Sequence, residues 1–325
     1  MRHSKLNFAV RQWDHLPKFA AVAIFLLGCW PAISSAQQPG QRTFASAEEA
    51  GSALAAATEA NDEKAMLAIF GPDGKQVVSS GDEVQDQEMR ANFVKKYLEM
   101  HRLVNEPDGT TTLIIGAENW PTPIPLVHKG NVWYFDTEAG TKEILYRRVG
   151  RNEITTIRVC QELVAAQKDY ASQNHGEYAM RFFSDAGQHN GLYWKAASGA
   201  PESPIGPLIA AAVKEGYANI PEGGATPFHG YYFHILTAQG HHAPGGSKNY
   251  IVRGKMTGGF AFVAYPAEYR SSGVMTFIVG SNGVVYEKDL GKNTEALVKA
   301  MKTFNPDSSW HKSETDQEQS ASQQK

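Results

Sequence analysis

The sequence predicts an exported α+β protein, and three patterns support this prediction. Apolar residues at three- and four-residue steps indicate helices in the first half of the chain and in a long central segment. Short runs rich in aromatic and β-branched residues at 228–237 and 258–290 predict an antiparallel meander. A basic stretch followed by an apolar one at the N-terminus is typical of an export signal.

Residues 1–36 have the order of a secretory signal peptide. Four basic residues precede or border the apolar run 19–27, and Ser34-Ser-Ala36 supplies small residues before a cleavage point. We expect cleavage after Ala36 and no integral membrane segment afterwards, because the run is shorter than the roughly 20 residues of a membrane-spanning helix. Lipoprotein processing at Cys29 and an uncleaved anchor are the alternatives.

The composition of the mature chain excludes several classes of function. Removing residues 1–36 takes away four basic residues and Asp14, so the net charge changes from −3 to −6. This charge gives no electrostatic reason to bind nucleic acid or an anionic membrane. Cys160 then stands as the single cysteine, which excludes an internal disulfide and a thiolate metal cluster. It adjoins Val159 and Leu163 on an apolar stripe, so we expect it to be buried.

After a polar linker at 37–43, residues 44–137 are predicted to form a domain of two helices and a small antiparallel sheet. Ser46-Ala-Glu-Glu49 is a capping box that begins a helix, which we expect to continue to Phe70. A second helix is predicted over 82–103. Strands are then predicted at three segments, of which the last two flank the tight turn Lys129-Gly130: 110–115, 123–128 and 131–136.

Residues 138–305 are predicted to form a second domain, in which a long helix packs on the meander. Helical periodicity runs over 138–173, and Gly150 is a point where this helix could break. The irregular segment 176–227 contains one short predicted helix at 206–215. A last helix is expected over 294–303, and the polar residues 306–325 predict a disordered tail.

The order of pieces over 153–290 resembles the soluble domain of type IV pilin-like and pseudopilin-like proteins. The residues that carry the likeness follow the long helix: Gly230-Tyr-Tyr-Phe, Phe262-Val-Ala-Tyr-Pro266 and Gly273-Val-Met-Thr-Phe277. The resemblance implies a helix packed on an antiparallel sheet. However, this helix follows a folded domain and begins with arginines, whereas a pilin helix begins with a long apolar half. Filament assembly through such a helix is therefore not expected.

Across 44–305 the chain also resembles an uncharacterised exported bacterial family, domain of unknown function 2950. Five motifs carry this resemblance: Phe70-Gly-Pro-Asp-Gly74, Trp133-Tyr-Phe-Asp136, Arg147-Arg-Val-Gly-Arg-Asn-Glu153, Ala243-Pro-Gly-Gly246 and Glu287-Lys-Asp-Leu-Gly291. The resemblance implies export and this arrangement of domains. It implies no activity, because the family is uncharacterised.

Two groups of residues are candidate binding sites. Arg147, Arg148 and Arg151 could clamp a phosphate or carboxylate, although such a cluster more often pairs with neighbouring acids, here Glu143 and Glu153. The second group consists of tyrosines expected on the outer face of the meander: Tyr232, Tyr265 and Tyr269. Outward aromatic rings suit a glycan or a partner protein, whereas inward rings form the core.

Phe260 and Phe262 lie on one side of their predicted strand, because alternate residues share a face, and Tyr265 lies on the other. We expect the two phenylalanines to face the long helix and Tyr265 to lie on the opposite, open face.

No catalytic motif is predicted from the sequence. His229 and His234 would alternate to opposite faces of a strand, and the remaining histidines of interest read as surface residues: His189, His241 and His242. A Gly-x-Ser-x-Gly elbow and phosphate-binding glycine motifs are absent from the sequence, and nothing in the spacing of Asp185, Glu202 and Glu268 favours glycoside cleavage. We therefore expect no metal and no cofactor.

The sequence thus favours a periplasmic or secreted, non-enzymatic binding or assembly module of the cell envelope, with an envelope protein or a glycan as partner. The alternative is an envelope hydrolase with a site in the loops at 185–247. The identity of the ligand and the oligomeric state do not follow from the sequence.

Overall fold

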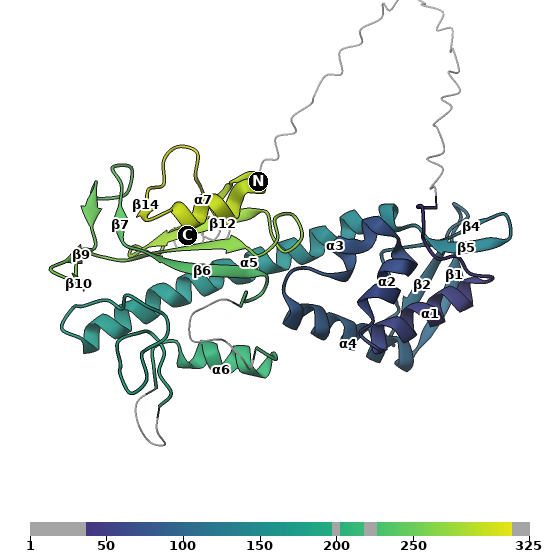
Figure 1. Ribbon diagram of the computed structural model, residues 1–325, viewed down its shortest axis with the longest axis horizontal. Helices are drawn as coiled ribbons and strands as arrows, with labels where there is room; N and C mark the ends of the chain where they lie inside the picture. Colours follow the sequence, from purple (N-terminus) through teal and green to yellow (C-terminus); the bar gives the residue numbers. More distant parts are fainter. Residues whose placement is uncertain (1–36, 197–201, 218–225, 314–325) are drawn as a thin grey trace, which may run out of the picture. The chain divides into compact units, whose positions relative to one another are not determined.

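The computed structural model describes residues 37–196, 202–217 and 226–313. These residues form an α+β protein with antiparallel sheets, as predicted. The expected signal peptide, with Cys29 and the cleavage point, lies outside the described residues. A long helix, α5 (Thr137–Gln173), runs between an N-terminal lobe built from residues 37–136 and a C-terminal lobe built from residues 174–313 (Figure 1).

The N-terminal lobe begins with four α-helices and a 3-10 helix. They are α1 (Ala47–Glu59), α2 (Glu63–Phe70), η1 (Pro72–Gly74), α3 (Lys75–Val78) and α4 (Glu83–Glu99). The predicted capping is present, because Ser46 accepts from the backbone N–H of Glu49 at 3.0 Å, and the Glu49 side chain reaches back to accept from the backbone N–H of Ala45 at 2.9 Å. The single helix expected up to Phe70 is wrong. Asn61 has a φ of 50°, and Asp62 starts a new helix by accepting from Ala65 N at 2.9 Å.

The small sheet of this lobe has the order β1-β2-β4-β5, with β3 paired to β2. Its strands are β1 (His101–Asn105), β2 (Thr111–Ile115), β3 (Trp120–Pro121), β4 (Leu126–Lys129) and β5 (Val132–Phe135). The second helix was expected to reach residue 103, but α4 ends at Glu99 and Leu103 pairs with Leu113 in the sheet. The hairpin around Lys129-Gly130 forms as predicted.

Helix α5 is continuous over 37 residues, about 55 Å, and does not break at Gly150. A Cβ at Gly150 would have nothing within 4 Å, so no neighbour forces a bend there. The first part of α5 contacts η1 and α3, and its later part packs on the C-terminal sheet. Cys160 is fully buried in the hydrophobic core between α5 and this sheet, as the sequence predicts.

The main C-terminal sheet is antiparallel with the order β15-β13-β12-β11-β6. Its strands are β6 (Tyr231–Leu236), β11 (Ala261–Pro266), β12 (Met275–Gly280), β13 (Val285–Asp289) and β15 (His311–Lys312). The disordered tail expected from residue 306 is wrong for its first part, because β15 pairs with β13. Residues 314–325 lie outside the described residues.

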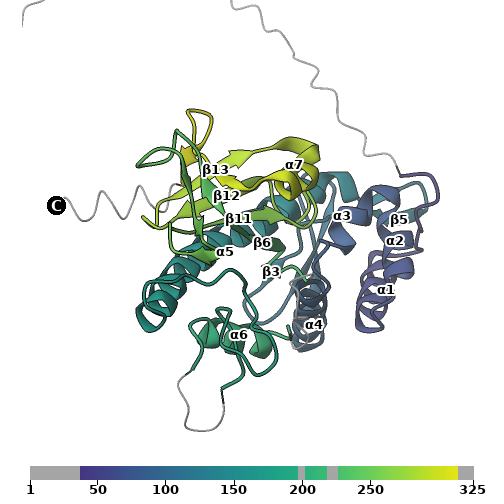
Figure 2. The same cartoon turned by 60° about the vertical axis from the view of Figure 1, so that its left-hand side comes forward.

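Short elements complete the C-terminal lobe: α6 (Gly206–Lys214), β7 (Ala238–Gln239), β8 (Lys248–Asn249), β9 (Ile251–Val252), β10 (Lys255–Met256), η2 (Gly291–Asn293), α7 (Thr294–Ala300) and β14 (Thr303–Phe304). Figure 2 shows α6 on one side of α5, with the main sheet and α7 on the other. All six residues of β11 are buried, since α5 and α7 both contact this strand.

A buried polar cluster joins α4 to the C-terminal lobe. The fully buried Asp82 carboxylate accepts from the hydroxyl of Tyr217 and from the backbone N–H of Gly230, both at 2.8 Å. The same carboxylate caps α4 by accepting from Gln85 N at 3.2 Å. This cluster fixes the first turn of α4 next to α5, because the Gln85 side chain also donates to Asn152 of α5 at 2.8 Å.

Candidate functional site

A cavity of about 230 Å³ lies in the N-terminal lobe between α1, α4, the small sheet and the first part of α5. Apolar side chains line most of it, together with Arg90, Arg147, Arg148 and Arg151. We call it the arginine cavity. It contains all three arginines that the sequence analysis singled out.

The apolar wall of the arginine cavity belongs to the hydrophobic core of the N-terminal lobe. Six of the side chains that it shares with this core are buried to 6 % exposure or less: Leu54, Met66, Phe70, Val78, Ile124 and Phe135. The close approach of α5 to this wall depends on Gly140, where a Cβ would lie only 2.6 Å from the Cα of Ile124. This contact places the arginine-bearing turns of α5 beside the core.

Arg148 is the most buried charged group of the cavity, with 1 % exposure. Its two Nη atoms donate to the carbonyls of Gln76 and Val77, at 2.7 and 3.1 Å. Its Nε has no hydrogen-bond partner among the described residues. Burial lowers the pKa of the guanidinium, and the charge of Asp86 opposes this effect. Arg148 therefore has a structural role and still offers one donor.

Asp86 is the single carboxylate among the described residues that line the arginine cavity. It is 3 % exposed and accepts from the backbone N–H of Ser80 at 2.8 Å. Burial raises the pKa of its carboxyl group, while the bonds from Ser80 and the charges of Arg148 and Arg90 act in the other direction. Asp86 thus offsets only part of the positive charge around it.

Two further buried polar atoms at the cavity lack partners within the described part of the chain, Arg90 Nε and Thr122 Oγ1. The Nη2 of Arg90 pairs with Glu83 at 3.1 Å, so only part of this guanidinium is satisfied. Buried donors without partners are uncommon because each costs about 1–3 kcal/mol. Their presence around one cavity indicates a site that can accept a polar ligand group.

Arg147 and Arg151 lie at the exposed side of the cavity. Arg147 pairs with Glu143 at 2.6 Å, as the sequence suggested. The expected pairing with Glu153 is wrong, because this carboxylate instead accepts from the backbone N–H groups of Val274 and Met275.

Arg151 forms no ion pair with any described residue, and its Nη2 lies 4.0 Å from the Sδ of Met89. Met89 and Trp120, which also line the cavity, are 36 % and 41 % exposed. The exposed side of the cavity therefore combines an unpaired cation with accessible apolar groups.

The sequence predicted the three arginines of α5 but missed Arg90 and Thr122. Met89, Phe93 and Tyr97 recur at four-residue steps and form an apolar stripe on the helix predicted over 82–103. The position of Arg90 beside this stripe was the available signal that it lies near the core. Nothing in the sequence indicated that α4 and the segment after β3 would meet α5. The binding role of the arginines stays a prediction.

The three tyrosines do not form one open surface. Tyr265 was expected on an exposed face, but it is 3 % exposed because α7 packs on β11. Its ring stacks on His234, and its hydroxyl lies 3.2 Å from the Nε2 of that residue. Tyr232 is half-buried beside it, while Tyr269 donates to Asp289 at 3.1 Å. A binding role for Tyr232 and Tyr269 stays a prediction, and Tyr265 does not offer the open face that was expected of it.

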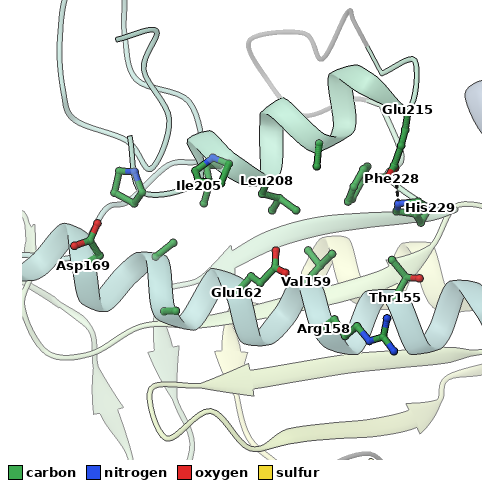
Figure 3. Close-up of a pocket in the computed structure, with 15 residues that line it drawn as sticks. Thr155, Arg158, Val159, Glu162, Asp169, Ile205, Leu208, Glu215, Phe228 and His229 are labelled. Carbon is green, nitrogen blue, oxygen red and sulfur yellow. Dashed lines mark ion pairs between the residues drawn. The ribbon is translucent and has the colours of Figure 1, made fainter. Parts of the chain in front are cut away.

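A second hollow, the α5–α6 groove, has a volume of about 540 Å³ (Figure 3). Val159 and Leu208 provide apolar contacts, Glu162 points from α5 toward the groove, and His229 pairs with Glu215 at 2.9 Å. His229 precedes β6 rather than lying in it, so the expected strand alternation with His234 does not apply.

The described residues of the α5–α6 groove do not include the nucleophile–histidine pair of a serine or cysteine hydrolase. Nucleophilic catalysis of the Ser–His or Cys–His type needs a hydroxyl or thiol hydrogen-bonded to a histidine. Among the described residues, no serine, threonine or cysteine side chain is hydrogen-bonded to the His229 ring. Its Nε2 pairs with Glu215, and the backbone N–H of His229 donates to the hydroxyl of Tyr217.

The described ranges contain neither a metal-binding cluster nor a membrane-spanning helix. No group of three or more His, Cys, Asp or Glu side chains in 37–196, 202–217 and 226–313 could hold a metal ion. No helix in these ranges is both long enough and apolar enough to cross a membrane.

Comparison with known proteins gives one match. The family model described as "Protein of unknown function (DUF2950)" matches residues 41–313. No curated protein and no solved structure matches the chain. The pilin-like description of residues 153–290 therefore stays a prediction.

Proposed function

We propose that this chain, which belongs to the family described as "Protein of unknown function (DUF2950)", is an exported, non-enzymatic binding module of the cell envelope that takes a small ligand into the arginine cavity. The observation that carries this proposal is the combination of an apolar cavity with three buried polar atoms that lack partners among the described residues: Arg90 Nε, Thr122 Oγ1 and Arg148 Nε.

The chemistry of the cavity supports binding rather than catalysis. Binding sites for small molecules are mostly apolar hollows with a few convergent polar groups. Arginine stays protonated and is a poor general base. Asp86, the single lining carboxylate among the described residues, accepts a hydrogen bond from Ser80. Export is supported by the order of residues 1–36, and the mature charge of −6 argues against a nucleic-acid partner.

The proposal can be tested with an uncharged apolar fluorescent reporter, N-phenyl-naphthylamine, titrated into the mature protein from Gln37 onward. We expect a saturable rise in fluorescence that corresponds to one site. Ile144→Trp should abolish it, because Ile144 lines the arginine cavity and the larger ring would fill it.

The matched control is Leu208→Trp, which places the same ring in the α5–α6 groove and should leave reporter binding unchanged. Circular dichroism establishes that both variants fold. Absence of saturable binding, or equal binding by wild type and Ile144→Trp, would show that the arginine cavity is not a ligand site.

A further inference from the structure

We infer that the ligand of the arginine cavity is an amphiphilic anion, with one short aliphatic chain and an acidic head group that carries anionic oxygens. This inference rests on the proposed function and adds the chemical class of the ligand. It follows from four properties of the cavity: an apolar wall, unsatisfied buried donors, excess positive charge and small volume.

The wall of the cavity favours an aliphatic chain. The side chains of Leu54, Phe70 and Ile124 line it and belong to the same buried core as Phe135. Each methylene that moves from water into such surroundings raises the affinity about fourfold. A sugar or a peptide backbone would instead bring polar groups against carbon atoms, which costs free energy.

The unsatisfied donors favour a head group that only accepts hydrogen bonds. The Nε atoms of Arg90 and Arg148 can donate but not accept, and neither has a partner among the described residues. Carboxylate and phosphate oxygens accept from guanidinium groups in strong, charge-assisted bonds. An amine head would add a further donor to a site that already has too many.

The charge balance gives the same result. Among the described residues, four arginines and one carboxylate line the cavity. Outside carboxylates pair with two of the arginines, Glu83 with Arg90 and Glu143 with Arg147. Arg151 has no such pair within the described ranges, and it is exposed, so it can meet an incoming anion before that anion is desolvated.

The size of the cavity limits the ligand to a single short chain. Its volume of about 230 Å³ lies below the roughly 300–1,000 Å³ of sites for drug-sized molecules, so a two-chain phospholipid does not fit. Met89 and Trp120, which line the cavity and are partly exposed, can contact a chain that enters from this side.

Displacement of the neutral reporter from the mature protein tests the inference with four compounds of equal chain length. These are octanoate, octyl phosphate, octanol and octylamine. Hydrogen bonds to charged groups contribute about 1.5–3 kcal/mol, so we expect at least one anion to bind roughly 10- to 100-fold more tightly than octanol. Octylamine should bind most weakly. The ratio of octanoate to octyl phosphate identifies the preferred acid.

Arg151→Gln locates the head group, since this residue is exposed and its replacement leaves the core intact. We expect the affinity for the preferred anion to fall about tenfold, while octanol binding stays unchanged. The matched control is Arg158→Gln, which removes an exposed arginine of the same helix that lines the α5–α6 groove. It should change neither affinity.

The possible failures are distinguishable. If the reporter binds but octanol competes as well as both anions, the cavity is a ligand site and the inferred ligand class is wrong. If Arg151→Gln and Arg158→Gln weaken the anions equally, the head group is not held at the arginine cavity. If the reporter itself does not bind, the proposed function fails.

Discussion

Two glycines of α5 have opposite surroundings, and their replacement by alanine tests how this helix is built. Gly150 lies in the helix interior with open space around the position of a Cβ. Gly140 faces the wall of the arginine cavity, where a Cβ would lie 2.5 Å from Ile124 Cγ1 and 2.6 Å from both Ile124 Cα and the carbonyl oxygen of Pro123.

The expected changes in the free energy of unfolding have opposite signs. Alanine is about 0.8–1.0 kcal/mol more favourable than glycine inside a helix, so Gly150→Ala should stabilise the protein by about that amount. Gly140→Ala gains the same helix propensity, but its Cβ must displace backbone atoms of Pro123 and Ile124. Overpacking costs about 1–3 kcal/mol, and we take the upper end because backbone atoms must move. We expect a net loss of about 2 kcal/mol.

Urea denaturation of the mature protein, followed by circular dichroism, measures both changes if the slopes of the transitions stay equal. Destabilisation by Gly150→Ala would mean that α5 is interrupted at this glycine. A neutral or stabilising effect of Gly140→Ala would mean that α5 does not approach Ile124 as described, which would also remove the basis for the cavity.

Three further predictions concern the core and its polar groups. Phe262→Ala and Tyr265→Ala should each cost about 3–5 kcal/mol in urea denaturation, because both side chains are buried; a neutral Tyr265→Ala would show that α7 does not cover β11. Asp82→Ala leaves two buried donors unsatisfied, so it should lower the free energy of unfolding by about 3–5 kcal/mol. Tyr217→Phe removes one of the two bonds and should lower it by about 1–2 kcal/mol. Equal losses in the two variants would show that Asp82 does not hold both donors. Burial raises the pKa of Tyr250 to about 12, above its unfolded value of 10.0. As pH rises, the Tyr250 hydroxyl therefore loses its proton in the unfolded state before it does so in the folded state. The free energy of unfolding should fall as pH rises from 10 to 12. The urea midpoint of Tyr250→Phe should therefore fall less steeply across this window than that of wild type, and identical slopes would contradict the assignment.

The sequence predicts elements whose signals are local. The capping box at Ser46, the hairpin at Lys129-Gly130 and the long helical periodicity all appear in the structure. The split between α1 and α2 was missed because Asn61 and Asp62 lie within a continuous helical pattern, and only the left-handed conformation of Asn61 breaks it.

Features that depend on packing between distant segments were predicted less well. Phe262 and Tyr265 are both buried, and the alternation of a strand does not reveal that a helix covers its second face. The arginines of α5 were identified as a cluster, whereas their position beside Arg90 and a cavity required the tertiary structure.

The position of a bound ligand chain tests the central claim most directly. We suggest a crystal structure of the mature protein with octanoate that carries bromine at its terminal carbon. The account predicts anomalous density for bromine among Leu54, Phe93 and Ile124, with the carboxylate at Arg151. Bromine in the α5–α6 groove beside Leu208, or no ordered bromine at a saturating concentration, would contradict it.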